Sequence, residues 1–188
     1  PAFAKKIKDY LDSIADVFPL AKHLQSAGYA VLVPDLRGHG ESTRVTGSDM
    51  TLDYDRFKPA QVASAINDVD QCRRILLNKN DAEEVNIDLL NVVAVGDSAH
   101  LAVQWAITDW SWPPIGGKKQ GQYVKSLTLV SPTEKFQRSS MNKLARAPVI
   151  SGSNGAAIPT FLLWGGQDSR AAGDGQDLFE LLSRTRPP

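Results

Sequence analysis

The sequence predicts an α/β fold in three layers, with a mostly parallel sheet covered by helices on both faces. Two observations predict it. Short, almost wholly apolar runs rich in β-branched residues are typical of strands buried on both faces, and the segments between them show helical periodicity. Strands and helices that alternate along a chain favour a parallel sheet. The 188 residues, 42% of them apolar and 22% charged, predict one compact domain over 1–188.

Each element follows from a local pattern. The predicted strands are the apolar runs 29–35, 91–95, 126–131 and 159–164. The predicted helices are an amphipathic one over 3–18, a continuation over 20–27 that stops at Gly28, a long one over 59–79, one that begins at the 98–101 segment, and a last one through Leu182. Residues 133–158 leave room for one short helix and a loop.

Composition excludes several classes of partner. Lys plus Arg and Asp plus Glu each total 21, so the net charge of zero gives no reason to expect nucleic acid or an anionic membrane. The apolar runs are far shorter than the roughly 18 residues that span a bilayer. A single cysteine, Cys72, excludes an internal disulfide and a cysteine-based zinc site, and no glycine-rich phosphate loop follows a strand. We therefore expect a soluble chain, cytoplasmic by default, with no metal and no cofactor.

Ser98 stands where the second predicted strand turns into a helix, at the carboxyl edge where parallel sheets bind ligands. A sharp turn of this kind lifts a serine hydroxyl clear of the sheet, and the helix N-terminus favours negative charge. Gly96 permits a close approach, and the Ala99 N–H would donate to an oxyanion. The same residues also suit a plain helix cap, because Asp97 and Ser98 are preferred capping types. This segment by itself leaves both interpretations open.

Three segments carry a resemblance to a known family. Residues 20–42 end in Pro-Asp-Leu-Arg-Gly-His-Gly-Glu-Ser, residues 96–100 read Gly-Asp-Ser-Ala-His, and residues 159–168 read Pro-Thr-Phe-Leu-Leu-Trp-Gly-Gly-Gln-Asp. In this order they resemble the α/β-hydrolase superfamily, in its lipase, esterase and proline-peptidase-like branch, over roughly residues 16–185. The resemblance implies a serine hydrolase that cleaves a small-molecule ester or amide.

The resemblance also implies roles for single residues. Ser98 would attack the carbonyl, a histidine would take its proton, and Asp168 would orient that histidine. The other implied residues line the pocket or hold its structure: Asp35, Arg37, His39, Gly96, Asp97 and His100. Trp110 and Trp112, with the prolines that follow, either flank an acyl pocket or pack within their own loop.

The chain departs from the family pattern in three places. His100 stands where the elbow motif has a glycine, and we expect a steric conflict between helix and strand there. No histidine follows Asp168, and His100 lies two residues along the helix from Ser98, a rotation of about 200°, so it points away. The strand that supplies a second oxyanion amide before Leu20 is missing, and losing such a donor costs about 10²–10³ in rate. We therefore expect weak or no labelling of this chain by a fluorophosphonate probe.

Besides an active hydrolase, two further interpretations remain open. In one, the chain is a catalytically inactive member of the fold that binds a ligand, or binds a protein partner through the apolar face of the 3–18 helix. In the other, the residues are part of a longer gene product that carries the missing histidine.

Overall fold

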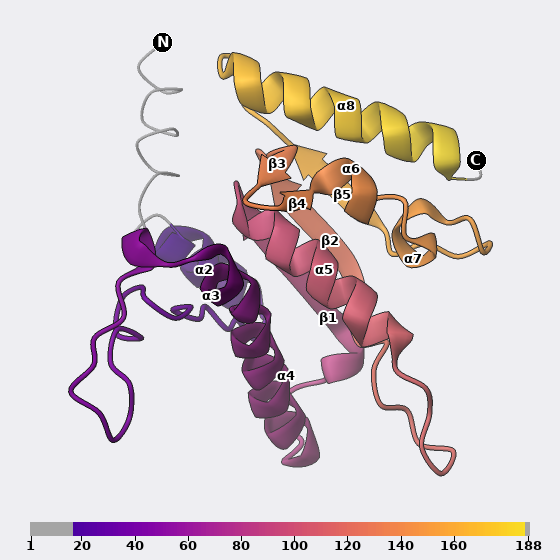
Figure 1. Ribbon diagram of the computed structural model, residues 1–188. Coiled ribbons are helices and arrows are strands. Elements are labelled where there is room, and N and C mark those ends of the chain that lie inside the picture. The colour runs from indigo at the N-terminus through magenta and orange to yellow at the C-terminus, as the bar shows by residue number, and fades with distance from the viewer. Residues whose placement is uncertain (1–16, 187–188) are drawn as a thin grey trace. The chain divides into compact units, whose positions relative to one another are not determined.

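The computed structural model describes residues 17–186 (Figure 1). The chain divides into two compact units, residues 1–55 and residues 56–188, and each is described by itself. The amphipathic helix predicted over 3–18 lies outside the described residues, except for its last two positions. Those two positions open helix α2 (Val17–Ser26).

Helix α2 ends where the sequence predicts. Gly28 has a φ of +91°, a conformation that favours a residue without a side chain. The N–H of Ala27 donates to the His23 carbonyl at 3.0 Å, and the N–H of Tyr29 donates to the Leu24 carbonyl at 3.1 Å. These bonds take up carbonyls that the helix end would otherwise leave without a partner.

The strand predicted over 29–35 is wrong. Residues 29–35 have no strand conformation and pair with no strand among the described residues of their own unit, 17–55. A strand exists only where a neighbouring strand takes up its backbone N–H and C=O groups. The apolar, β-branched run therefore indicates the capacity to form a strand, whereas its pairing depends on a neighbour.

The second unit contains a small parallel sheet. Its strands are β1 (Leu90–Val95), β2 (Val124–Val130) and β5 (Thr160–Leu163), in the order β1-β2-β5. The register pairs Val93 with Thr128 and Thr128 with Phe161. Three of the four predicted strands and their parallel direction are thus confirmed, and the described chain is of the α/β class.

Helices and a short hairpin connect these strands. From residue 54 onward the other elements are η2 (Tyr54–Arg56), α3 (Pro59–Ser64), α4 (Ile66–Asp81), η3 (Ile87–Leu89), α5 (Ser98–Ser111), β3 (Lys135–Phe136), β4 (Ser139–Ser140), α6 (Met141–Leu144), α7 (Pro148–Ser151) and α8 (Ser169–Thr185). Residues 133–158 therefore hold two short helices and a hairpin, where we expected one helix and a loop.

The helix predicted over 59–79 is two helices. Pro59 opens α3 at the first helical position, where its missing N–H costs nothing. At Ala65 the helical turn narrows to the 3₁₀ type, because the Ala65 N–H donates to the Val62 carbonyl, three residues back. Helix α4 then begins at Ile66.

The core lies on one face of the sheet, under helix α5 (Figure 1). Ala94, Leu127 and Leu129 point from β1 and β2 toward buried α5 residues such as Val103 and Ala106. Short helices α6 and α7 add Met141, Ala145 and Ile150 to the same cluster. Burial of these side chains is the main force that holds the second unit together.

Helix α8 approaches the end of β5 through a glycine. Gly175 is buried, and a Cβ atom added there would lie 2.8 Å from the Cε3 atom of Trp164. Real Cβ atoms do not come so close to a ring carbon, so this position needs a residue without a side chain. Leu178 and Leu182 then bury the next turns of α8 in the core.

The opposite face of the sheet is open. Alternation along the strands places Val93, Phe161 and Leu163 on this face, where they are 45%, 61% and 42% exposed. The described residues of the second unit therefore form two layers, the sheet and the helices on one of its faces, and they do not show the expected three-layer architecture.

The start of β2 is held by a buried carboxylate that sequence reasoning missed. The Asp109 side chain on α5 is inaccessible to solvent, and its Oδ2 atom accepts the N–H groups of Tyr123 and Val124 at 2.8 and 3.0 Å. Burial raises the pKa of the Asp109 carboxyl above its ordinary value, against the effect of these two hydrogen bonds. The sequence offered no signal, because an aspartate inside a helical segment normally faces solvent.

Candidate functional site

The predicted nucleophile stands at the carboxyl edge of the sheet. Strand β1 ends at Val95, Gly96 and Asp97 form the turn, and α5 begins at Ser98. Gly96 has a φ of +58°, which permits this short turn. The strand-to-helix junction predicted from the sequence is therefore present.

The Ser98 hydroxyl is bonded to the end of its own strand. Its Oγ donates to the Val95 carbonyl at 2.9 Å and accepts the Val95 N–H at 3.0 Å. The Gly96 N–H donates to Val130 on β2, so by alternation the Val95 groups face the open edge of β1. The hydroxyl thus takes the place that a neighbouring strand would fill for Val95.

The predicted oxyanion donor is also engaged. The N–H of Ala99 donates to the Gly96 carbonyl at 3.2 Å, and Ala99 is fully buried. A substrate oxygen would have to displace this carbonyl before it could accept the hydrogen bond. The same holds for the neighbouring His100 N–H, which donates to the Asp97 carbonyl at 3.1 Å.

The steric conflict expected at His100 is absent, because the imidazole lies in a buried site where both ring nitrogens have hydrogen-bond partners. The ring is 1% exposed, its Nε2 lies 2.9 Å from the Thr133 carbonyl, and its Nδ1 lies 2.9 Å from the Ser139 Oγ. A carbonyl only accepts, so Nε2 carries a hydrogen, and in the neutral ring Nδ1 then accepts from the serine hydroxyl. Burial lowers the pKa of the imidazole, while the Thr133 carbonyl and nearby Asp97 and Glu134 act in the opposite direction.

These bonds fasten the segment after β2 to the start of α5. The Thr133 hydroxyl donates to the Asp97 carboxylate at 2.7 Å, and the Phe136 ring lies 5.8 Å from the His100 ring. Thr133 follows the predicted strand 126–131, so its position at the carboxyl edge could have been predicted from the sequence. Ser139 carried no signal, because it reaches His100 only through the β3-β4 hairpin.

Asp168 follows the end of β5 at the same edge. Its Oδ1 atom accepts the N–H groups of Arg170 and Ala171, both at 3.1 Å, and so caps helix α8. Within residues 17–186 no hydrogen bond reaches its Oδ2 atom. This oxygen is therefore available to a group that donates a hydrogen bond.

No histidine within residues 56–186 is placed to serve as the base. His100 is the sole histidine in that range, and both of its ring nitrogens are engaged. In the first unit, the His39 Nδ1 donates to the Arg37 carbonyl at 3.3 Å, and its ring lies 4.4 Å from that of Tyr54. The Asp35 carboxylate accepts the Glu41 N–H at 3.0 Å, so these residues hold the 35–42 loop together.

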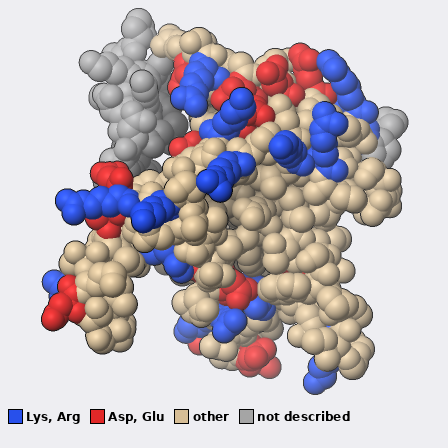
Figure 2. All heavy atoms as spheres, in the orientation of Figure 1, with Lys and Arg blue, Asp and Glu red and all other residues tan. Residues whose placement is uncertain are grey.

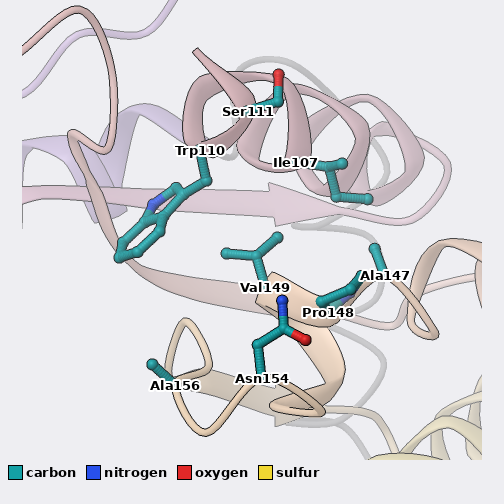
Figure 3. A pocket seen from close by; sticks show the side chains of 8 residues that line it. All are labelled: Ile107, Trp110, Ser111, Ala147, Pro148, Val149, Asn154 and Ala156. Atoms are coloured by element: carbon teal, nitrogen blue, oxygen red, sulfur yellow. The ribbon is translucent and has the colours of Figure 1, made fainter. Parts of the chain in front are cut away.

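Two cavities lie on the surface of the second unit. One of about 430 Å³ lies at the carboxyl edge and is lined by Glu134, Lys135, Arg170 and Asp174. The other, of about 340 Å³, lies at the far end of α5 and is mostly apolar (Figure 3). Trp110 lines this second cavity, whereas the Trp112 ring packs under the Arg73 guanidinium at 4.5 Å. Both tryptophans therefore stand at the end of α5 that is opposite to Ser98, and the acyl-pocket interpretation finds no support in their position.

Comparison with protein-family models, with curated proteins and with solved structures returns no match for this chain.

The remaining surface of the described residues shows no membrane-spanning helix and no metal-binding cluster. Among the helices described between residues 17 and 186, none is long and apolar enough to cross a membrane. Over the same residues, no three His, Cys, Asp or Glu side chains gather as a metal site would need. Basic and acidic side chains lie interspersed on the face shown in Figure 2, in keeping with the balanced charge.

Proposed function

We propose that the chain is an α/β-hydrolase-like serine hydrolase that cleaves an ester or amide through Ser98, with Asp168 as the acid. The observation that carries the proposal is that Ser98 and Asp168 follow the carboxyl ends of β1 and β5, two parallel strands of one sheet. Parallel sheets bind ligands at this edge. The resemblance of residues 20–42, 96–100 and 159–168 to the hydrolase pattern supports the same roles.

The bonds of Ser98 oppose attack only weakly. Rotation of the side chain about its Cα–Cβ bond breaks the two hydrogen bonds to Val95, each worth about 0.5–1.5 kcal/mol. An enzyme lowers its barrier by about 8 kcal/mol or more, so this cost leaves room for catalysis. The base is the larger requirement, and in this proposal the Asp168 Oδ2 atom, which caps no N–H group of α8, would orient it.

A second candidate is a non-catalytic member of the fold that binds a ligand or partner. Three engaged groups favour it: the Ser98 hydroxyl, the Ala99 N–H and the His100 ring are all bonded within the fold. In this interpretation Ser98 caps the open edge of β1 and Asp168 caps α8. Both residues would then stabilise the fold without touching a substrate.

Fluorophosphonate labelling in the presence of imidazole separates the two candidates. If only the base is lacking, wild-type protein should label slowly, and about 0.1 M imidazole should accelerate labelling at least tenfold, in the range of general-base effects. Ser98→Ala should abolish labelling, as followed by mass spectrometry of the modified peptide.

Asp168→Asn provides the matched control. The asparagine Oδ1 atom can still accept the Arg170 and Ala171 N–H groups, so the α8 cap and the melting temperature should persist. The acceleration by imidazole should fall, because the amide no longer holds an imidazolium ion. No labelling at any imidazole concentration supports the non-catalytic candidate, and labelling that survives Ser98→Ala rules out Ser98 as the nucleophile.

A further inference from the structure

The apolar cavity at the end of α5 has no role in the proposed hydrolysis. Helix α5 begins at Ser98, and Ile107 and Ser111 on the cavity wall lie nine and thirteen residues further along. At 1.5 Å per residue this places them about 14–20 Å from Ser98 along the helix axis. The cavity therefore belongs to the amino edge of the sheet, and an inference about it does not depend on the proposed function.

The walls of the cavity come from two directions. Figure 3 shows Ile107 and Trp110 on the side of α5 toward the α7 region, which carries Ala147, Pro148 and Val149, and the loop with Asn154 and Ala156, whereas the Ser111 hydroxyl points away. No charged residue lines the cavity, although the Lys125 ammonium lies 5.8 Å from the centroid of the Trp110 ring. The Trp110 indole is held in place because its Nε1 donates to the Val124 carbonyl at 2.9 Å. A fixed indole offers a flat surface on which an aromatic ring can stack.

One polar side chain lining the cavity is uncommitted. The Ser111 hydroxyl donates to the Thr108 carbonyl at 2.7 Å. Within residues 17–186 no hydrogen bond engages the Asn154 amide, whose side chain points toward Val149 in Figure 3. An amide of this kind offers one acceptor and two donors to a ligand.

The size of the cavity sets the size of the ligand. An apolar cavity of about 150 Å³ in another protein stays dry and binds benzene. At about 340 Å³ this cavity is roughly twice as large, which corresponds to two fused rings. We propose that the cavity between α5 and α7 binds a small, neutral, bicyclic aromatic molecule, with its rings against Trp110 and one hydroxyl or N–H group on the Asn154 amide.

Titration calorimetry with 2-naphthol tests the proposal. We expect one molecule of 2-naphthol to bind per chain. Ala156→Phe places a ring in the cavity from the exposed loop and should weaken 2-naphthol at least tenfold. Asn154→Ala should weaken it severalfold by removing the polar contact.

Ser153→Phe is the matched control, because it adds the same ring to the same loop at a residue that does not line the cavity. It should bind 2-naphthol as the wild type does, and all variants should keep the wild-type melting temperature within about 2 °C. Absence of binding overturns the proposal. So does equal weakening by Ala156→Phe and Ser153→Phe, or wild-type affinity in Ala156→Phe, since either result places the ligand elsewhere on the surface.

Discussion

His100 shows how one buried side chain can replace an expected glycine. A glycine in this place lets a helix pack closely on a strand, whereas the imidazole here reaches outward to Thr133 and Ser139 and fastens another segment to α5. Burial disfavours the charged form of the ring, and the neutral ring satisfies both partners, with Nε2 donating to Thr133 and Nδ1 accepting from Ser139. Its contribution to stability must therefore depend on pH.

We expect the melting temperature to fall as the pH drops from 7.5 to 5.5. Burial lowers the pKa of His100 in the folded state below its ordinary value of 6.5, so the unfolded chain binds the proton first. Stability is therefore full above about pH 6.5 and is lost as the pH falls toward the folded-state pKa. Thermal melts followed by circular dichroism at several pH values measure the slope.

His100→Gln isolates this contribution, because the glutamine amide can donate to the Thr133 carbonyl without titrating. The variant should lose at least half of the slope between pH 7.5 and 5.5. Asp97 and Glu134 lie nearby and remain in both proteins. An unchanged slope would show that another group causes the pH dependence.

At the scale of elements, helix α8 carries two glycines with opposite roles. Gly173 is exposed, and an added Cβ would meet nothing within 4 Å. Gly175 is buried, and its added Cβ would lie 2.8 and 2.9 Å from two carbons of the Trp164 ring. The same substitution two residues apart therefore tests whether α8 packs on Trp164 as described.

Gly173→Ala should stabilise the protein by about 0.5–1 kcal/mol, because alanine loses less backbone entropy than glycine in a helix. Gly175→Ala should destabilise it by about 1–3 kcal/mol, because the methyl group forces α8 or the indole to move. Urea unfolding followed by far-UV circular dichroism gives both values. Stabilisation by both substitutions would contradict the close packing of α8 on Trp164.

At the scale of the whole molecule, the sheet of the second unit has one covered face and one open face. Parallel sheets usually have both faces covered, and the alternation on β5 shows the contrast within two residues. Phe161 is 61% exposed on the open face, whereas Leu162 packs against the core cluster. The stability of the sheet should therefore depend on one of these residues and not on the other.

Phe161→Thr should change the free energy of unfolding by less than about 0.5 kcal/mol, because the ring is largely in solvent and threonine suits a strand. Leu162→Ala should cost about 2–4 kcal/mol through the cavity it leaves. Chemical denaturation of both variants measures the difference. A loss above about 1.5 kcal/mol for Phe161→Thr would indicate that another surface covers this face in solution.

Local patterns were sufficient wherever the cause was local. The apolar runs at 91–95, 126–131 and 159–164 predicted three strands, and the Gly28 position predicted the end of α2, because strand propensity and capping depend on neighbours in sequence. The turn that leads from Val95 to Ser98 followed from the same reasoning. The order of Ser98 and Asp168 behind two strands of one parallel sheet was also accessible from the pattern alone.

Tertiary structure decided everything that depends on partners distant in sequence. The 29–35 run has the composition of a buried strand but no strand partner among the described residues of its own unit, 17–55, and the Ser98 hydroxyl bonds the backbone of Val95 at the end of β1. His100 is accommodated because Thr133 and Ser139, more than thirty residues away, reach its ring. Backbone and side-chain hydrogen bonds must be satisfied wherever the chain becomes buried, and only the assembled fold determines which groups meet.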